Sequence, residues 1–545
     1  MKGVMMFNFR FVCLITSLLF CVGLAAELTT DWFGAYGGAG TEEATATCFD
    51  NAGNYYVAGN FSGSLTIGSQ TLSSGAHTFI FVAKFNSAGQ FIWAKQSSGS
   101  SGNTCLAYVK SICADVNNNL YICGNFKDKM GFGISGASAL SSLNYNDIFV
   151  AKLNSSGAFE WATQAGGSAD NDYANSICIG ADNSPVLCGD FSGNATLFGT
   201  SVTSSGSKDI FVAKLSPIDG SCLHLSHFGS SGSDTANSIC AISNGNYAIC
   251  GTYNGSIAFG STNLNDIGRE AYICNLDSNL APLWANSSNG TGDQDGDTVS
   301  ANGSSIVISG RYTNAVNFGD LSLSAPLTGY ALFAAKLDLS GNFVWLTSME
   351  ATTSAGKCLV SYIHTNAELY LAGVFTGSLG ALVSNGSSDG FILKLSCDGD
   401  SLWAQSWGGT GADFAYSICG NPAGQVLCAG YNSAGIANIL GNQVTNYGTK
   451  DIFAILISET SAMIPASPQN VRIVRMAGTL QLAWDAVTVS QTGSPLAVSA
   501  YQIYHSNTLL EEDFQLLGTC TGTSYILSGA ETGDNVRFYR VIAVP

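Results

Sequence analysis

The chain has 545 residues, of which 46% are hydrophobic, so a large core can be buried. Only 11% are charged, well below the ~25% of ordinary globular chains. There are 64 glycines but only 9 prolines. This composition argues against a disordered chain and against long surface helices, and it favours many short strands joined by Gly, Ser and Asn turns.

The formal net charge is −18 at pH 7, from 20 basic and 38 acidic residues. A protein this acidic repels phosphate backbones and anionic lipids. We therefore expect no nucleic-acid partner and no direct membrane binding. The charge suits a soluble surface or a binding activity that depends on cations.

Residues 1–26 have the pattern of a signal peptide. Lys2 and Arg10 supply positive charge, residues 11–24 form an apolar run, and two alanines follow as a cleavage point. The alternative is a membrane anchor, but about 14 apolar residues fall short of the ~20 that a span requires. We expect a protein that is secreted or displayed on the cell surface.

The next part of the chain repeats one phrase seven times, at a period of about 60 residues. In each copy a glycine ends an apolar stretch, at Gly59, Gly124, Gly189, Gly251, Gly310, Gly373 and Gly430. Eleven positions earlier the copies have Cys48, Cys113, Cys178, Cys240, Val299, Tyr362 and Cys419. A further matched position, which marks the approximate start of each repeat, has Trp32, Trp93, Trp161, His224, Trp284, Trp345 and Trp403.

Each repeat is expected to form four strands, named A to D in chain order. Strand A carries the phrase Ser-Ile-Cys, whose small side chains suit the crowded centre of a ring. Strand C, such as residues 148–153, is an almost continuous apolar run, as in a strand buried on both faces. Four strands per repeat are typical of a propeller. The sequence predicts an all-β fold, with a seven-bladed β-propeller over residues 31–458 and a small β-sandwich after it.

The order of the strands predicts how the ring closes. The repeats begin with a D-type strand at Trp32 and end after a C-type strand at residues 451–458. We predict that the N-terminal strand, residues 31–36, completes the last blade by pairing with residues 452–457. This closure would remove exposed strand edges.

These repeats resemble a bacterial seven-bladed β-propeller repeat family. The resemblance rests on the phrase Asp-Ile-Phe-Val-Ala-Lys-Leu at residues 209–215 and on Gly-Gly pairs before an acid, and it covers about residues 31–458. It implies a fold and an envelope or secreted location, and it implies no particular activity.

The C-terminal part has a different pattern. Residues 459–468 include two prolines and are interpreted as a linker. Residues 469–545 resemble a fibronectin type III module, in which Trp484 matches the family's core Trp and Tyr539 matches a Tyr of a later strand. Such modules act as spacers or binding domains, so the resemblance favours a surface protein.

Five repeats carry an acid shortly before strand A, and two have a small residue there. The acids are Glu42, Asp172, Asp234, Asp293 and Asp413, and the two small residues are Ala107 and Gly356. Carboxylates at equivalent positions would ring one face near the channel, where they could contact a ligand or Ca²⁺. The alternative, which repetition itself favours, is that each acid fixes its own loop by accepting backbone N–H groups.

The densest acidic cluster is Asp293, Asp295 and Asp297, which alternate like part of an EF-hand loop. The glutamate expected at the twelfth position is Ser304 instead. The cluster is the best single candidate for a Ca²⁺ site. No other metal or cofactor is indicated.

Three cysteine pairs share a spacing of ten residues: Cys113 and Cys123, Cys178 and Cys188, Cys240 and Cys250. Across an A–B hairpin the members would lie nearly opposite each other, close enough for disulfides in an oxidising compartment. The alternative is that they are buried thiols that serve as small apolar residues. No Cys-x-x-Cys spacing points to zinc.

Five lysines recur near the end of strand C, where we expect a structural place at the rim; they are Lys84, Lys152, Lys214, Lys336 and Lys394. No catalytic signature is present in the sequence. The leading hypothesis is a monomeric, non-enzymatic binding or adhesion protein that meets an extracellular glycan or protein on the face formed by the D–A and B–C loops. The alternatives are a secreted polysaccharide hydrolase or lyase that uses acids near the channel mouth, and a purely structural envelope protein.

Overall fold

The computed structural model describes residues 28–99, 105–326, 329–350, 356–364, 366–433 and 435–459, together with 472–476, 479–483, 486, 500–506, 515–527 and 538–544 near the C-terminus. The chain divides into two compact units, one of which is Thr29–Ser458. The expected signal peptide and most of the expected linker lie outside the described residues. None of the described segments is a helix long and apolar enough to cross a membrane.

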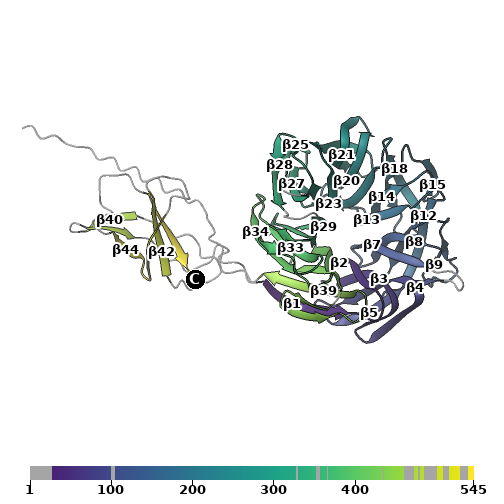
Figure 1. The fold of residues 1–545 in the computed structure, drawn as a ribbon, viewed down its shortest axis with the longest axis horizontal. Helices are drawn as coiled ribbons and strands as arrows, with labels where there is room; N and C mark the ends of the chain where they lie inside the picture. Colours follow the sequence, from purple (N-terminus) through teal and green to yellow (C-terminus); the bar gives the residue numbers. More distant parts are fainter. Residues whose placement is uncertain are drawn as a thin grey trace, which may run out of the picture. The chain divides into compact units, whose positions relative to one another are not determined.

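The larger unit is an all-β propeller, as the sequence predicted. Its sheets stand around a central axis, with β2, β7, β13, β23 and β29 nearest the centre (Figure 1). Four of them have four antiparallel strands each. They consist of β13 (Tyr173–Ile179), β14 (Pro185–Phe191), β17 (Asp209–Leu215) and β18 (Cys222–Phe228); β23 (Gln294–Ala301), β24 (Ser305–Tyr312), β27 (Ala331–Asp338) and β28 (Phe343–Glu350); β29 (Gly356–Ile363), β30 (Leu369–Phe375), β33 (Asp389–Leu395) and β34 (Ser401–Trp407); and β35 (Phe414–Gly420), β36 (Val426–Asn432), β39 (Asp451–Glu459) and β1 (Leu28–Tyr36).

A fifth sheet contains β19 (Thr235–Ala241), β20 (Tyr247–Phe259), β21 (Thr262–Leu276), β22 (Pro282–Gly290), β25 (Val316–Phe318) and β26 (Leu321–Leu323). Counted by hydrogen-bonded sheets, five blades therefore stand apart, against the seven that the repeats predict. The rest of the ring is one ten-stranded sheet of β2 (Glu42–Phe49), β3 (Tyr55–Ile67), β4 (Gln70–Phe85), β5 (Phe91–Gln96), β7 (Leu106–Ala114), β8 (Leu120–Lys127), β11 (Asp147–Leu153), β12 (Phe159–Gly167), β15 (Asn194–Leu197) and β16 (Thr200–Thr203). One parallel pair, Thr78 with Leu106, joins its β4 to its β7.

The burial of the strands follows their place in a blade. Every residue of β14 and β17 is buried, because the neighbouring blades cover both faces of these middle strands. The A strand β13 is mostly half-buried, with Ala174 and Ile177 buried. The outer strand β18 is mostly exposed or half-buried. This layering explains the continuous apolar runs in strands B and C.

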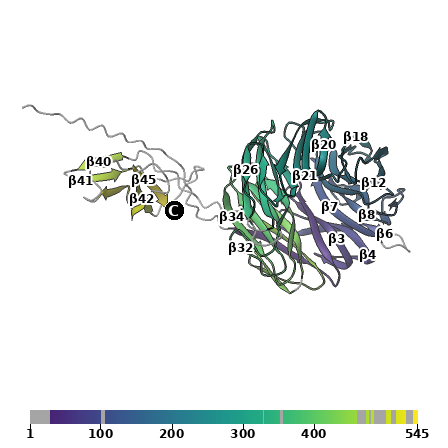
Figure 2. The same cartoon turned by 45° about the horizontal axis from the view of Figure 1, so that its top comes forward.

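The segments between strands B and C form β-hairpins, whereas the sequence suggested that they are loops. They are the paired outer halves of β3 with β4 and of β20 with β21, and the pairs β9 (Lys129–Gly131) with β10 (Leu140–Ser141), β15 with β16, β25 with β26, β31 (Ser378–Leu379) with β32 (Leu382–Val383), and β37 (Ile436–Ile439) with β38 (Asn442–Thr445). Figure 2 shows β3 and β4 running side by side. Alternate side chains such as Leu65, Ile67 and Leu72 are buried. The hairpins therefore belong to the core of the ring.

The B–C hairpins also connect neighbouring blades. The last residues of β12 pair with β15 of the following repeat, and β22 pairs with β25 in the same way. The short strand β6 (Ser98–Gly99) likewise pairs with β9. The outermost strand of one repeat is therefore tied to the hairpin of the next, which makes these segments poor candidates for freely moving binding loops.

The N-terminal strand lies beside the last strand of the ring. β1 is hydrogen-bonded to β39 in the sheet that also holds β36 and β35. A residue near the N-terminus, Thr41, further bridges Lys450 of the last repeat. The two ends of the repeat region therefore meet.

In the smaller unit, two three-stranded sheets are described. One contains β40 (Arg472–Met476), β41 (Thr479–Ala483) and β44 (Ser524–Leu527), and the other contains β43 (Gln515–Cys520), β42 (Ala500–Ser506) and β45 (Phe538–Val544). Trp484, which carries half of the resemblance to a fibronectin type III module, lies outside the described residues. Tyr539 lies in β45, opposite His505 of β42.

Candidate functional site

Four of the five acids expected to form a ligand face are fully buried and bind backbone amides; they are Glu42, Asp172, Asp234 and Asp413. The two oxygens of Asp172 accept hydrogen bonds from Gly167 N at 2.7 Å and Ser192 N at 2.9 Å. Gly167 ends β12, just before the D–A loop, and Ser192 begins the B–C segment. The acid at the head of strand A thus ties together the two loops that surround it.

The other three acids are held in the same way. Asp413 accepts from the amides of Gly409 and Ser433. Asp234 accepts from Ser230 N and Asn254 N, and Glu42 accepts from Gly38 N. Burial raises the pKa of Asp172 and of Asp413 to about 6 each, against the opposing effect of these amides. The structure therefore gives these acids the loop-fixing role that was the alternative to a ligand face.

The fifth expected acid, Asp293, does not occupy the equivalent position. Asp293 is exposed, and the fully buried Gln294 begins the strand instead. The reason is a shorter A–B turn in this repeat. Gly310 pairs with Gly296, fourteen positions earlier, whereas Gly189 pairs with Ala174, fifteen positions earlier. Counting back from the glycine therefore misplaces this repeat by one residue.

The expected Ca²⁺ cluster is not assembled in the structure. Asp295 accepts from Arg269 Nε at 2.6 Å and from Arg311 Nε at 2.7 Å, and Thr252 also donates to it. Burial opposes ionisation of Asp295, but the two arginines outweigh it and hold its pKa below the usual range. Asp297 is the bulge residue two positions on, and Asp293 lies before the strand. The three acids therefore do not form a cluster, and the described residues contain no group of three potential metal ligands.

A second set of buried acids begins strand C, and sequence reasoning missed it. Its members are Asp147, Asp209, Glu270, Asp389 and Asp451. Their signal in the sequence is the acid that opens the phrase Asp-Ile-Phe-Val-Ala-Lys-Leu at residues 209–215. Four of these carboxylates cap the end of their own B–C segment, as Asp147 does by accepting from Leu143 N at 3.3 Å.

The six cysteines proposed as disulfides are free thiols in the structure. Cys113 lies opposite Tyr121, and Cys123 lies opposite Ser111, so the two cysteines are offset by two positions in the strand register. The two cysteines are therefore diagonal neighbours, at the ~7–8 Å Cα separation that disfavours a bridge. The same offset separates Cys178 from Cys188 and Cys240 from Cys250.

The recurring lysines and tryptophans form links between repeats. Lys336 Nζ and Trp345 Nε1 both donate to the carbonyl of Cys397, each at 2.9 Å, in the C–D turn of the next repeat. Lys152 and Trp161 bind Pro217 O in the same manner. Lys84 and Lys214 also donate to a carbonyl of the next repeat, so these lysines have the structural role that their regularity predicted.

One cavity formed by described residues lies on the axis of the ring, between the A strands of the repeats. Its volume is about 310 Å³. Hydroxyl side chains make up much of its lining: Thr47, Ser111, Ser176, Ser238, Thr298, Ser300, Ser361 and Ser417. Isoleucines lie next to several of them in the sequence, and Tyr362, Cys240 and Cys419 also line the cavity.

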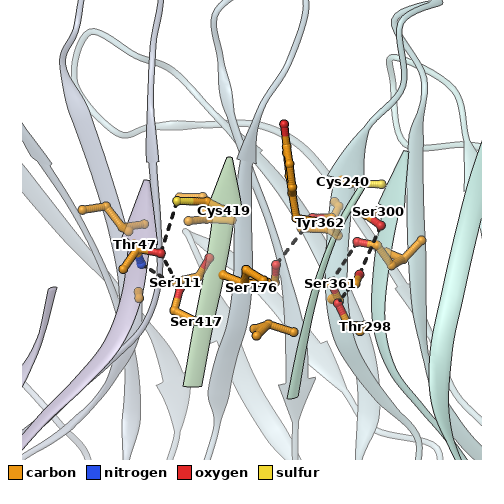
Figure 3. A pocket seen from close by; sticks show the side chains of 18 of the residues that line it. Thr47, Ser111, Ser176, Cys240, Thr298, Ser300, Ser361, Tyr362, Ser417 and Cys419 are labelled. Atoms are coloured by element: carbon orange, nitrogen blue, oxygen red, sulfur yellow. Dashed lines mark hydrogen bonds between the residues drawn. The ribbon is translucent and has the colours of Figure 1, made fainter. Parts of the chain in front are cut away.

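Several of these hydroxyl groups already bond across neighbouring strands (Figure 3). Thr47 Oγ1 lies 2.8 Å from Ser417 Oγ, and Thr298 Oγ1 lies 3.0 Å from Ser361 Oγ. Ser361 also donates to Ser300 at 3.1 Å. The described lining carries one cationic side chain, the exposed Lys110. The cavity thus has a mostly neutral, hydroxyl-rich lining, which suits binding by hydrogen bonds.

No protein-family model matches the chain, and no curated protein matches it. Among solved structures it is similar to a virginiamycin B lyase from Staphylococcus aureus, at 7% identity over 79% of this chain and 99% of that chain, with a TM-score of 0.38. It is also similar to a quinohemoprotein alcohol dehydrogenase from Comamonas testosteroni (9% identity, 83% and 79% coverage, TM-score 0.39) and to the endosialidase of phage phi92 (11%, 96% and 88%, TM-score 0.37). At such identities and TM-scores these likenesses assign no activity to this chain.

Proposed function

We propose that this chain is a secreted or surface-displayed protein that binds a neutral glycan in the cavity on its axis. The observation that carries the proposal is the ring of hydroxyl side chains contributed by successive A strands. Serine and threonine hydroxyls both donate and accept hydrogen bonds, as the hydroxyl groups of a sugar do. A volume of about 310 Å³ is at the small end of ligand pockets, which suits the end of a glycan chain.

Binding is favoured over hydrolysis because of where the acids lie. A glycosidase needs two carboxyl groups that reach the scissile bond. Here Asp172 and Asp413 are fully buried, and backbone amides occupy both oxygens of each. Carboxylates committed in this way support the loops and are not presented to a substrate.

A screen of immobilised glycans with the purified full chain tests this proposal. We expect binding to a limited set of neutral glycans, with no change in the glycan after long incubation. Release of shortened or unsaturated products would favour the hydrolase or lyase alternative instead. Failure to bind any glycan, together with normal folding, would favour a structural envelope protein.

We further propose that the ring has seven blades. The ten-stranded sheet contains two antiparallel sets, β2 to β5 and β7, β8, β11 and β12, linked through one parallel pair at Thr78. The same parallel contact occurs as an isolated bridge between other repeats, for example Lys208 with Ser233. Taking that link as a contact between blades gives seven four-stranded sets, one for each sequence repeat.

We also propose that residues 469–545 form a fibronectin type III-like module. The pairing orders β40–β41–β44 and β43–β42–β45 support it, because they divide the strands into two sheets of the kind that a β-sandwich requires. The module would serve as a spacer or a second binding domain. Proteolysis between the two units should release it as a folded fragment.

A further inference from the structure

The two sets of buried acids occur together at the same boundaries between repeats. The acid that begins strand C of one repeat lies beside the residue that begins strand A of the next, because their backbones pair there: Asp172 N donates to Asn146 O, and Asp413 N donates to Ser388 O. Acids face each other in four such positions: Asp147 with Asp172, Asp209 with Asp234, Asp389 with Asp413, and Asp451 with Glu42.

At the other three boundaries between repeats, either both acids or one of the two acids is replaced. Where strand A begins with Ala107, the preceding strand C has Phe79 at the matching place, and Gly356 is likewise preceded by Ala331. At the remaining boundary Gln294 takes the place of the second acid, beside Glu270. Acids are thus present in pairs or absent in pairs, apart from one pair in which an amide replaces a carboxyl. This pattern indicates that the two side chains interact directly.

The pair Asp147 and Asp172 is the best defined. Both side chains are buried, at 1% and 0% exposure. A Cβ placed on Gly166 would lie 2.7 Å from Asp147 Oδ1 and 3.0 Å from Asp172 Oδ2, so the two oxygens flank one point. Asp147 Oδ1 accepts no hydrogen bond from any described residue. A buried carboxylate oxygen without a hydrogen bond lowers the stability of the folded state unless it carries or accepts a proton.

We propose that each facing pair of buried carboxyl groups shares one proton, which joins one repeat to the next by a hydrogen bond between carboxyl groups. In the pair described above, Asp172 is the anionic partner, because two backbone amides already neutralise its charge. Asp147 carries the proton on Oδ1 and donates it to Asp172. Two ionised carboxylates buried side by side would repel each other, so one proton per pair is the stable state.

A metal ion is the competing occupant, and three observations disfavour it. Both oxygens of Asp172 are already bound by N–H groups, which repel a cation. The described residues offer no third carboxylate, histidine or cysteine for a shared site. The amide of Gln294 can replace a protonated carboxyl as a hydrogen-bond donor, but it lowers the negative charge that Ca²⁺ needs.

The charged groups around this pair are few. Asp190 lies near Asp172, and it is paired with Lys208 at 2.6 Å. Lys110 is the other cation near Asp190. Burial and the charge of Asp172 raise the pKa of Asp147 to about 7, and burial raises that of Asp172 to about 6. Because these pKa values are higher than in the unfolded chain, the stabilisation is fully present only below the unfolded pKa of Asp, about 4, declines as pH rises above it, and is lost once pH has risen through the folded values of about 6 and about 7.

Infrared spectroscopy of the full chain tests the proposal directly. At pH 6 exposed carboxyl groups are ionised, so a remaining carbonyl band of protonated carboxyl reports buried protons. We expect such a band in the wild type and expect it to fade by pH 8. In Asp147→Asn the band should lose about one quarter of its intensity, since one of four shared protons is gone, whereas the exposed control Asp400→Asn should leave it unchanged.

Denaturant unfolding between pH 5 and pH 8.5 provides a second readout. In the wild type, the denaturant concentration at the midpoint of unfolding should fall as pH rises. In Asp147→Asn this midpoint should depend less on pH while the fold is retained, because the amide replaces the protonated carboxyl. Absence of the band at pH 6, or a band that Asp147→Asn does not weaken, would overturn the proposal. Loss of the band on adding CaCl₂, with a rise in stability, would overturn it in favour of a cation.

Discussion

The hydroxyl groups of Thr29 and Ser458 lie 2.9 Å apart, although 429 positions separate these residues in the chain. Ser458 also donates to Asp31 at 2.8 Å, and Asp31 accepts from Gln425 at 2.7 Å. These contacts join the first strand of the repeat region to the last. A chain that closes on itself in this way leaves no open edge at the junction.

The closure predicts a specific loss of stability for Trp32→Ala. Trp32 lies 5.1 Å from Tyr55 and 5.0 Å from Phe85 between ring centroids, so it fixes β1 to the first repeat. We expect a loss of roughly 3 kcal/mol in the free energy of unfolding, at the lower end of the range for Trp→Ala because Trp32 is only partly buried. Urea unfolding measures this loss. The exposed Leu402→Ala is the control and should stay within about 0.5 kcal/mol of the wild type.

The links between repeats predict a smaller effect for Lys336→Met. The ammonium group of Lys336 donates to Cys397 O at 2.9 Å in the next repeat. Removing this half-exposed charged hydrogen bond while keeping the length of the side chain should cost about 1 kcal/mol. The same substitution at the exposed Lys127 should change little. Equal unfolding midpoints for the two variants would show that the contact contributes nothing to stability.

The thiols predict an ordered pattern of chemical modification. Burial raises the pKa of Cys240 and of Cys419 to about 12, so both remain protonated and unreactive at pH 8. Cys397 is the exposed cysteine among the described residues. We expect maleimide to label Cys397 rapidly and the other two only after unfolding, as followed by mass spectrometry of peptides. Recovery of a Cys113–Cys123 disulfide from the native protein would contradict the free-thiol assignment.

The ion pairs of Asp295 predict a pH-dependent cost. In Asp295→Ala, Arg269 and Arg311 lose their common partner, which should lower stability by about 2 kcal/mol at pH 7. Because the folded protein holds the pKa of Asp295 below its usual value, this stabilisation is present above the unfolded pKa and disappears as pH falls through the folded one. The difference between variant and wild type should therefore shrink in acid. A difference that persists at the lowest pH at which the chain folds would argue for a packing role.

The repeat pattern predicted the all-β propeller because strands B and C are buried on both faces in every copy, which leaves a strong apolar signal. The position of Asp293 was wrong because one residue is missing from the turn between Asn302 and Ser305, and a count along the sequence cannot register a shortened turn. The sequence could not predict that Asp147 and Asp172 face each other, because they belong to two different repeats that only the fold brings together. The buried hairpins were missed because Ser, Gly and Asn dominate segments whose few apolar residues, such as Leu197 and Val202, point inward.

The binding role of the axial cavity can be tested most directly by filling it. Ser111 lines the cavity, and Ser111→Trp would occupy much of its volume of about 310 Å³. Calorimetric titration with a glycan identified in the screen should show binding to the wild type, none to Ser111→Trp, and unchanged binding to Ser87→Trp, a control in an exposed turn. Undiminished binding by a folded Ser111→Trp variant would contradict the account and move the ligand away from the axis.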